Sequence, residues 1–405
     1  MNNALNIAIE KNEKFTTANL GCFLRLPLTR HNMAFASLLC RMQMDASNAY
    51  PSVGQQLLRL EELYSMRFEA TVQLYGKDLI LSYLADFVEP QQILDPDYTY
   101  ETVMETFAQL VTGPLLSKEV LELAQRQLAD DYQTLMAEPS NYALAAFFDN
   151  WYASQPDYAS SFMGPIDLIE DATVQEMNRF VASLPAMPVV FLGNAYDKGQ
   201  VERLAKKYFN YKGLTREFAD NALKIKAPKL DLEKAEVQGN QQAQLFLGYA
   251  YSGAGNLPDQ ITGLVLRHYL TGEQSSRLFT KVREENGAAY AVESSWFVDN
   301  SLFLINAGLD PEKVDRAKQI IVEEMKKVAA GRIDPGLLKQ SKQALVNQTL
   351  LGQDQESWLL SKQLRGELKP EYAAFDQIKA AKAVTVNKLR EFAQKLILNE
   401  SYVLR

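Results

Sequence analysis

The sequence predicts an α+β protein built from two similar halves, and three observations lead to this prediction. The chain has 405 residues, which is long for one domain and typical of two. Hydrophobic residues make up 47% of it, enough for a large core in each half. The order of expected elements also repeats: after a shift of about 222 positions, Leu57 meets Phe279 and Leu60 meets Val282.

In the first half, alternating and helical hydrophobic patterns indicate strands and helices in a definite order. A strand at 19–28 precedes a helix at 32–43 and a second helix at 55–64, for which Ser52 is the expected N-cap. A hairpin at 68–87 turns at Gly76. The remaining elements are helical segments at 98–136 (broken near Gly113), 142–152 and 171–184, a buried strand at 187–192 and a helix at 201–208.

Residues 213–239 differ in composition from their surroundings, because they contain four lysines and Pro228 and show little periodicity. We therefore predict an N-terminal domain at 1–212, a linker at 213–239 and a C-terminal domain at 240–405. The second domain repeats the order of the first, with a strand at 243–251, helices at 259–270 and 276–285, and a hairpin at 288–309. It ends with helices at 311–330, 335–351, 355–366 and 386–396 and a strand at 401–404.

Charge and composition exclude several classes of function. The formal net charge of -8 argues against a nucleic-acid partner, which needs a concentrated positive surface. The two cysteines, Cys22 and Cys40, are too few for a disulfide scaffold. The N-terminal residues show no export signal, and no apolar run has the ~20 residues that a membrane-spanning helix needs. These features predict a soluble, cytoplasmic protein without a membrane partner.

The most informative stretch is 272–296, which reads as a helix start, an amphipathic helix, a glycine stop and a strand. Ser275 or Ser276 is the expected N-cap, and Gly287 the expected stop. The apolar helix positions are Leu278, Phe279 and Val282, and one face of the strand carries Tyr290, Val292, Ser294 and Trp296. This geometry leaves Arg283 in the last helical turn and Tyr290 early in the strand, where both side chains could face one groove.

This stretch resembles the second half of insulinase-type zinc metallopeptidases, the family of pitrilysin and the mitochondrial processing peptidases. The matching residues are Ser275-Ser276-Arg277-Leu278-Phe279, Val282-Arg283-Glu284 and Gly287-Ala288-Ala289-Tyr290. The resemblance covers most of the chain. It implies two homologous domains, each an antiparallel-rich sheet packed with helices, which together form half of a peptide-enclosing chamber.

The metal motif of that family is missing. Its active members carry His-x-x-Glu-His on the first helix, where two histidines bind zinc and the glutamate takes a proton from the metal-bound water. The corresponding helix here, around residues 34–42, has no histidine and no glutamate, and Cys40 alone is not a site. The only histidines, His31 and His268, have no second histidine at ligand spacing, and we expect both to be structural. We therefore predict no metal site in this chain.

The resemblance gives Arg283 and Tyr290 a catalytic and substrate-binding role. In the family, the equivalent arginine holds a substrate carbonyl and the tyrosine hydroxyl hydrogen-bonds the developing oxyanion at a zinc site located in another domain. The residues alone leave a second interpretation open, in which Arg283 pairs with a neighbouring glutamate and Tyr290 packs in the sheet.

Some bacterial members divide the work between a subunit with His-x-x-Glu-His and a subunit with the Arg/Tyr pair, and this sequence resembles the second kind. The hypothesis is a zinc-free subunit of a heterodimeric peptidase that acts on peptides and is inactive alone, with zinc expected in the partner. The alternative is a non-enzymatic peptide-binding or scaffold protein, for instance a homodimer, of the type linked to elongation factor P modification or peptide export.

Overall fold

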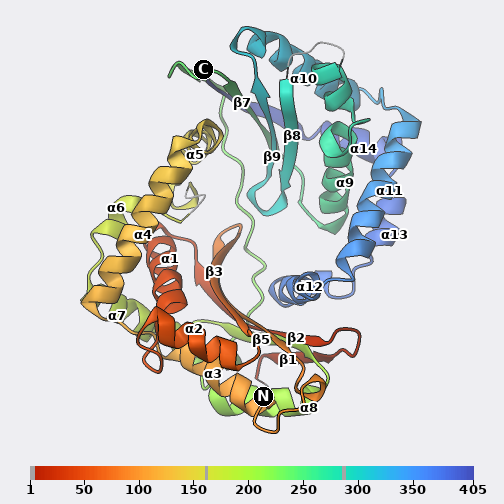
Figure 1. The fold of residues 1–405 in the computed structure, drawn as a ribbon. Helices are drawn as coiled ribbons and strands as arrows, with labels where there is room; N and C mark the ends of the chain where they lie inside the picture. The colour runs from red at the N-terminus through yellow and green to blue at the C-terminus, as the bar shows by residue number, and fades with distance from the viewer. Residues whose placement is uncertain (1–4, 160–162, 285–288) are drawn as a thin grey trace. The chain divides into compact units, whose positions relative to one another are not determined.

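The computed structural model describes residues 5–159, 163–284 and 289–405, apart from the side chains at 283, 284, 289 and 290 (Figure 1). Two compact units are present. The first comprises Met1–Gln133, Ser160–Ala222 and Gln353–Ala373, and the second comprises Thr134–Ala159, Leu223–Gly352 and Ala374–Arg405. The boundaries of these units therefore differ from the predicted domain boundaries at residues 212 and 240, because each unit includes a segment from the other half of the sequence.

The first unit contains a five-stranded sheet in the order β1-β5-β2-β4-β3. The short edge strand β1 runs parallel to β5, and all other pairs are antiparallel. The strands are β1 (Ile7–Lys11), β2 (Thr17–Pro27), β3 (Arg67–Tyr75), β4 (Asp78–Val88) and β5 (Val189–Ala195). The predicted hairpin is formed by β3 and β4, with Gly76 at a positive φ of 54° in its turn.

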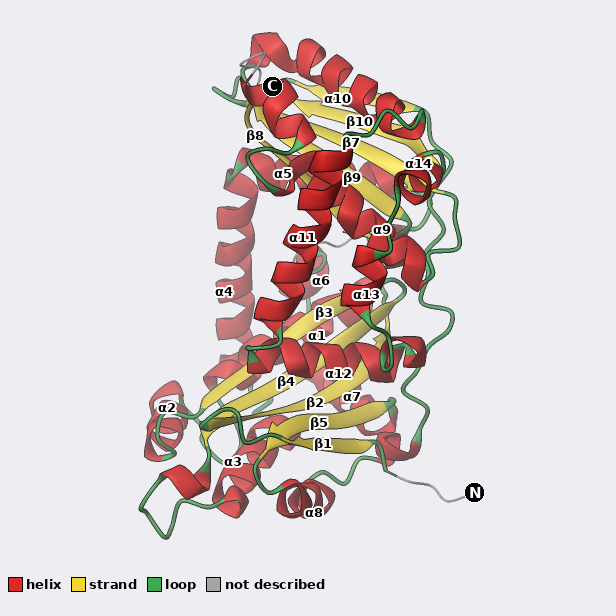
Figure 2. Ribbon diagram, turned by 90° about the vertical axis from the view of Figure 1, so that its right-hand side faces the viewer, coloured by secondary structure: helices red, strands yellow, loops and turns green. Residues whose placement is uncertain are grey.

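Helices cover both faces of this sheet (Figure 2). One face receives helices from the first half of the chain, and the other receives α12 (Glu356–Leu368), which packs on β5 and β2. Most contacts of these helices with the strands are made by α1 (Arg30–Asp45), α3 (Tyr100–Thr112) and α8 (Lys198–Tyr208). The other helices of this half are α2 (Val53–Glu62), α4 (Lys118–Ala137), α6 (Ile166–Glu170) and α7 (Val174–Ser183). The predicted break near Gly113 separates α3 from α4.

The second unit repeats this sheet strand for strand, in the order β6-β10-β7-β9-β8. Here too the first edge strand, β6, is parallel to its neighbour and the other pairs are antiparallel. The strands are β6 (Leu232–Glu236), β7 (Ala243–Tyr251), β8 (Ala289–Phe297), β9 (Leu302–Leu309) and β10 (Leu396–Leu404). The prediction of two antiparallel-rich sheets packed with helices is confirmed.

The second unit has two hydrophobic cores, because successive side chains of a strand point to opposite faces of the sheet. On β7, Leu245 and Leu247 face the larger core, whereas Phe246 packs with Phe147 and Trp151 of α5 (Pro139–Trp151) in the smaller one. Gly248 permits the close approach of α5, because a Cβ there would lie 2.6 Å from Phe147. The other helices are α9 (Leu257–Arg267), α10 (Val314–Ala329), α11 (Pro335–Gly352), α13 (Gln377–Lys382) and α14 (Val386–Ala393).

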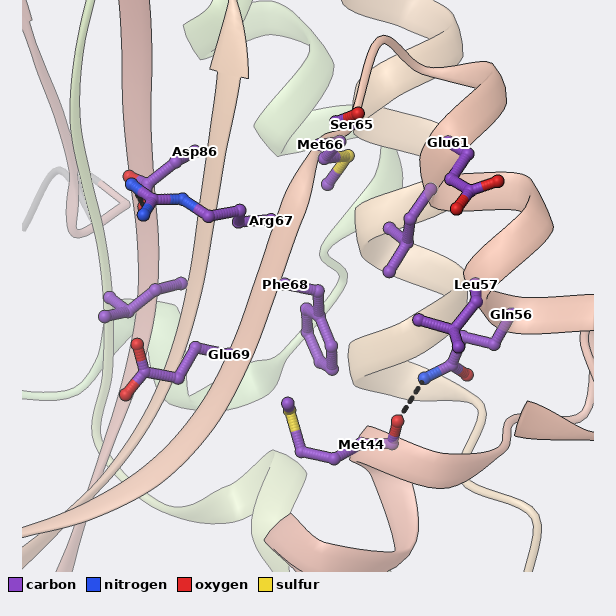
Figure 3. A pocket seen from close by; sticks show the side chains of 12 residues that line it. Met44, Gln56, Leu57, Glu61, Ser65, Met66, Arg67, Phe68, Glu69 and Asp86 are labelled. Atoms are coloured by element: carbon purple, nitrogen blue, oxygen red, sulfur yellow. Dashed lines mark hydrogen bonds and ion pairs between the residues drawn. The ribbon is translucent and has the colours of Figure 1, made fainter. Parts of the chain in front are cut away.

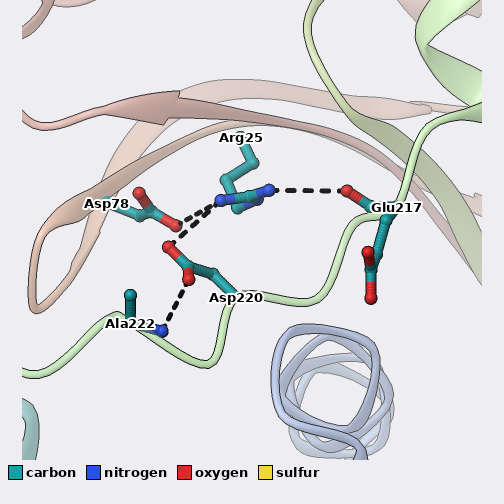
Figure 4. Close-up of polar contacts among 5 residues, drawn as sticks. All are labelled: Arg25, Asp78, Glu217, Asp220 and Ala222. Carbon is teal, nitrogen blue, oxygen red and sulfur yellow. Dashed lines mark hydrogen bonds and ion pairs between the residues drawn. The ribbon is translucent and has the colours of Figure 1, made fainter.

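Arg25 ties the chain that leaves the first unit to its sheet (Figure 4). One guanidinium nitrogen, Nη1, donates to Asp78 at 3.0 Å and to Asp220 at 3.2 Å, and Nη2 donates to the carbonyl of Glu217 at 3.4 Å. Burial raises the pKa of Asp78 to about 6, although the nearby Arg25 opposes the rise.

Within the described residues, no helix is long and apolar enough to cross a membrane.

Candidate functional site

Helix α1 is the helix to which the family resemblance assigns the metal motif, and its buried side chains are mostly apolar. Thr29 caps the helix by accepting a hydrogen bond from the Asn32 amide at 3.1 Å. Ala36, Leu39 and Cys40 have the i, i+3, i+4 spacing of a His-x-x-Glu-His motif, and their exposed fractions are 0%, 1% and 6%. Burial raises the pKa of the Cys40 thiol well above its usual range, so the thiol stays neutral and is a poor metal ligand.

Neither histidine is placed to complete a metal site. His31 stacks on Phe35 with a ring-centroid distance of 4.2 Å. His268 is buried, and its Nε2 lies 3.2 Å from Oε1 of Gln348. Burial lowers the pKa of His268, which favours its neutral form. Among the described residues, no group of three or more His, Cys, Asp or Glu side chains could hold a metal ion. The described residues therefore offer no set of side chains that fits zinc.

Helix α4 is held to its neighbours by side-chain contacts. Asp131 on α4 forms an ion pair with Arg41, the residue that follows Cys40 on α1. Gln125 donates to the backbone carbonyls of Ile169, Glu170 and Ala172 at 2.9–3.0 Å, which fixes the segment after α6. These contacts link α4 to its neighbours without a metal.

The described part of the 272–296 stretch forms a helical segment and a strand, with two differences from the prediction. Leu278 and Val282 are fully buried, as the hydrophobic stripe predicts. Most of the helix is π-helical (Phe279–Glu284), a rare form that is frequent at functional sites. Ser276 does not cap it, because its buried Oγ has no hydrogen-bond partner in the described part of the chain. Gly287, the expected stop, lies outside the described residues.

Ion pairs and hydrogen bonds hold this helix and strand in the second unit. Arg277 contacts Glu324 of α10 at 2.6 Å, and Lys327 contacts the same carboxylate at 2.7 Å. Burial opposes ionisation of Glu324, but the two cations outweigh it and lower its pKa. The hydroxyls of Thr271 and Ser294 lie 2.7 Å apart and join the chain before the helix to β8.

Arg283 and Tyr290 lie in these two elements, and their side chains are outside the described part of the structure. Arg283 belongs to the π-helical segment and Tyr290 to β8. Val292 and Ser294 are buried on one face of β8, as predicted. The register shifts between Ala289 and Ala291, which indicates a β-bulge, so simple alternation cannot be extended back to Tyr290. The role of the pair therefore stays a prediction.

Comparison with known proteins decides the family. The model of the peptidase M16 inactive domain matches residues 142–345, half of the chain. The chain belongs to the M16 (insulinase-type) peptidase family. A probable inactive metalloprotease of Bacillus subtilis, YmfF, is 24% identical over 356 residues, which cover 85% of this chain and 82% of that protein. An uncharacterized zinc protease of Streptomyces coelicolor is 23% identical over 316 residues, covering 76% and 68%.

Solved structures share the fold of this M16 chain. A conserved protein from Enterococcus faecalis has a TM-score of 0.91 at 20% identity and covers 100% of this chain and 97% of its own. The peptidase M16 inactive domain from Pseudomonas fluorescens has a TM-score of 0.78 at 16% identity and covers 100% and 95%. The family model thus confirms the predicted membership in the insulinase-type family, and the solved structures confirm the fold.

The M16 chain also has a groove between α2 and β3 that sequence reasoning missed (Figure 3). Its volume is about 520 Å³, and Phe68, Leu57 and Met44 form its apolar part. Leu57 and Met44 are 54% and 42% exposed. Gln56 closes one end by donating to the carbonyl of Met44 at 3.0 Å. In sequence, these residues lie on separate helices and a strand, so only the fold brings them together.

Proposed function

We propose that this chain is the zinc-free subunit of a heterodimeric, cytoplasmic insulinase-type peptidase. A partner with His-x-x-Glu-His would supply zinc and the general base, and this chain would supply substrate-binding and oxyanion-stabilising side chains. The observation that carries the proposal is the contrast between two segments. Apolar, buried residues fill the metal-ligand positions on α1, while the 272–296 stretch keeps Arg283 and Tyr290.

In this proposal the two side chains act at a site whose metal the partner holds. The phenol of Tyr290 donates a hydrogen bond to the oxygen that becomes negative as the peptide carbonyl is attacked. The guanidinium of Arg283 donates to a substrate carbonyl and positions the peptide. The ion pair between Arg277 and Glu324 supports this proposal. It anchors the helical segment that carries Arg283, and hydrogen-bond donors act best on a rigid support.

The test is turnover by the complex of this chain with a similar-sized subunit that carries His-x-x-Glu-His. Tyr290→Phe should lower kcat roughly 100-fold, because one lost oxyanion donor is worth about 3 kcal/mol. Tyr249→Phe is the matched control, since the buried Tyr249 hydroxyl has no hydrogen-bond partner among the described residues. Equal kcat values for Tyr290→Phe and the wild type would contradict the oxyanion role.

A non-enzymatic peptide-binding protein is the second candidate, and the groove between α2 and β3 favours it. Exposed Leu57 and Met44 beside an edge strand suit an extended peptide with apolar side chains. A native pull-down followed by light scattering separates the two candidates. Recovery of a partner with His-x-x-Glu-His supports the peptidase subunit, whereas homodimers without such a partner support the binding protein.

A further inference from the structure

Helix α12 packs on a sheet face that carries a row of polar side chains in the first unit (Figure 2). Asn194 of β5, Asn19 of β2 and Asp86 of β4 are register partners on neighbouring strands, so their side chains lie on one face of the sheet. Asn194 is 1% exposed and Asn19 is 2% exposed. The helix and the three strands all belong to the first unit, so the row is a property of that unit.

Two side chains of α12 reach this row. Oε2 of Glu356 accepts a hydrogen bond from Oγ1 of Thr17 at 2.5 Å. Thr17 lies two residues before Asn19 on β2, so the two side chains share the face that α12 covers. Nε2 of Gln363 donates at 3.4 Å to the carbonyl of Gly193, the residue before the β5 asparagine. Glu356 and Gln363 are about two helical turns apart, so they lie on the same side of α12. Both asparagines therefore lie between the sheet and the polar side of α12.

Four buried oxygens of this cluster have no hydrogen-bond partner among the described residues: Oδ1 of Asn19, Oδ1 of Asn194, Oε1 of Glu356 and Oε1 of Gln363. The orientation of two amides is fixed, because Nδ2 of Asn19 donates to Asp86 and Nε2 of Gln363 donates to a carbonyl. Their free atoms are therefore acceptors. Nδ2 of Asn194 is also unpaired, so the unused acceptors outnumber the unused donors. Because buried polar groups are nearly always paired, the cluster indicates a place for a species that oxygen atoms bind.

The charge of the cluster indicates that this species is a cation. Asp86 is already paired with Arg67 at 3.0 Å, whereas Glu356 has no ion pair in the described part of the chain. A cation at the cluster would meet one carboxylate and neutral amide oxygens. Oxygen ligands of this kind suit hard metal ions, whereas zinc favours histidine and cysteine.

The charge of the ion follows from the number of carboxylates, because one carboxylate balances one positive charge. Neutral carbonyl oxygens can also replace the hydration shell of K⁺. We propose that the cluster of Asn19, Asn194, Glu356 and Gln363 binds an alkali-metal cation, K⁺ or Na⁺, which fastens α12 to the sheet of the first unit. The proposal does not depend on the proposed function.

Thermal unfolding of the full chain tests the proposal. KCl or NaCl at about 100 mM should raise the midpoint by roughly 3 °C relative to tetramethylammonium chloride, whose cation is too large for a buried site. Asn194→Leu has a similar volume without the oxygen and should lose this difference. Glu356→Gln can still accept from Thr17 and should raise the salt concentration needed for half of the effect about tenfold. Glu371→Gln, an exposed change in the same unit, should respond like the wild type.

Crystals soaked in a thallium(I) salt give a second measurement, because Tl⁺ resembles K⁺ and scatters X-rays anomalously. An anomalous peak among the four oxygens would support the proposal, and a water molecule there without anomalous signal would overturn it. Equal midpoints in the three chlorides, or an undiminished response of Asn194→Leu, would overturn it as well. Stabilisation by calcium chloride but not by KCl or NaCl would show that the ion is not an alkali cation.

Discussion

Replacing Glu400 by glutamine should make the stability of the protein less dependent on pH. Glu400 lies on β10 beside the contact with α5 and is fully buried. Neither of its carboxylate oxygens has a hydrogen-bond partner within the described residues. Burial raises its pKa from 4.5 to about 8, and the nearby Asn150 and Lys234 only partly oppose the rise. Lys234 is engaged elsewhere, with Glu236 at 3.2 Å.

The direction in which stability changes with pH follows from proton linkage. The folded state holds the Glu400 proton more tightly than the unfolded state, so the residue does not destabilise the fold below pH 4.5. Destabilisation grows as the pH rises from 4.5 to about 8, and then levels off. Each pH unit is worth about 1.4 kcal/mol, so the loss near neutral pH is roughly 3 kcal/mol. Glutamine keeps the shape without the charge and should recover much of this free energy of unfolding.

Urea unfolding at a series of pH values measures this effect. The difference in free energy of unfolding between Glu400→Gln and the wild type should be small near pH 4.5 and should increase toward pH 8. Glu391→Gln on α14 is the control, because it makes the same substitution at an exposed position outside this buried contact. A pH-independent difference for Glu400→Gln would refute the linkage argument.

Two further predictions concern the first unit. Arg25→Ala should lower the free energy of unfolding by about 3 kcal/mol, because it leaves the 7%-exposed Asp78 side chain without its cation. Arg67→Ala, which removes a pair whose arginine side chain is 79% exposed, should lower it by less than about 1 kcal/mol in the same urea titration; equal losses would contradict the role of burial. Gly213→Ala should abolish stable folding or shift the thermal midpoint strongly, because its Cβ would lie 1.6 Å from the Met187 carbonyl oxygen. Gly54→Ala, which meets nothing within 4 Å, should raise the midpoint slightly, and similar midpoints for the two variants would contradict the steric argument.

The sequence predicted the elements whose side chains are buried in a regular pattern. The β3–β4 hairpin, the break between α3 and α4, and the buried face of β8 at Val292 and Ser294 carry this signal, and all were found. The edge strands β1 and β6 show little of this regular pattern of burial. Ile9 is the only buried residue of β1, and β6 has none, so backbone pairing with a neighbouring strand defines them. Part of the predicted linker is therefore a strand.

The absence of metal ligands on α1 could also be read from the sequence, because it depends only on which residues occupy the helix. Other features depend on long-range contacts that a local pattern does not encode. Ser276 has the residue type of a cap, but its buried Oγ finds no hydrogen-bond partner among the described residues. The bulge before Ala291 depends on the register with β9. The groove between α2 and β3 joins side chains from two helices and two strands that only the fold brings together.

Residue type and periodicity thus determined the repeated architecture, the family resemblance and the loss of the metal motif. Only the tertiary structure decided that α5 and α12 each cover the sheet of the unit made largely from the other half of the sequence. The physical reason is that the apolar face of an amphipathic helix must pack against some apolar surface, but the helix sequence does not specify which surface that is. That choice depends on which sheet face is left uncovered once all the strands have paired.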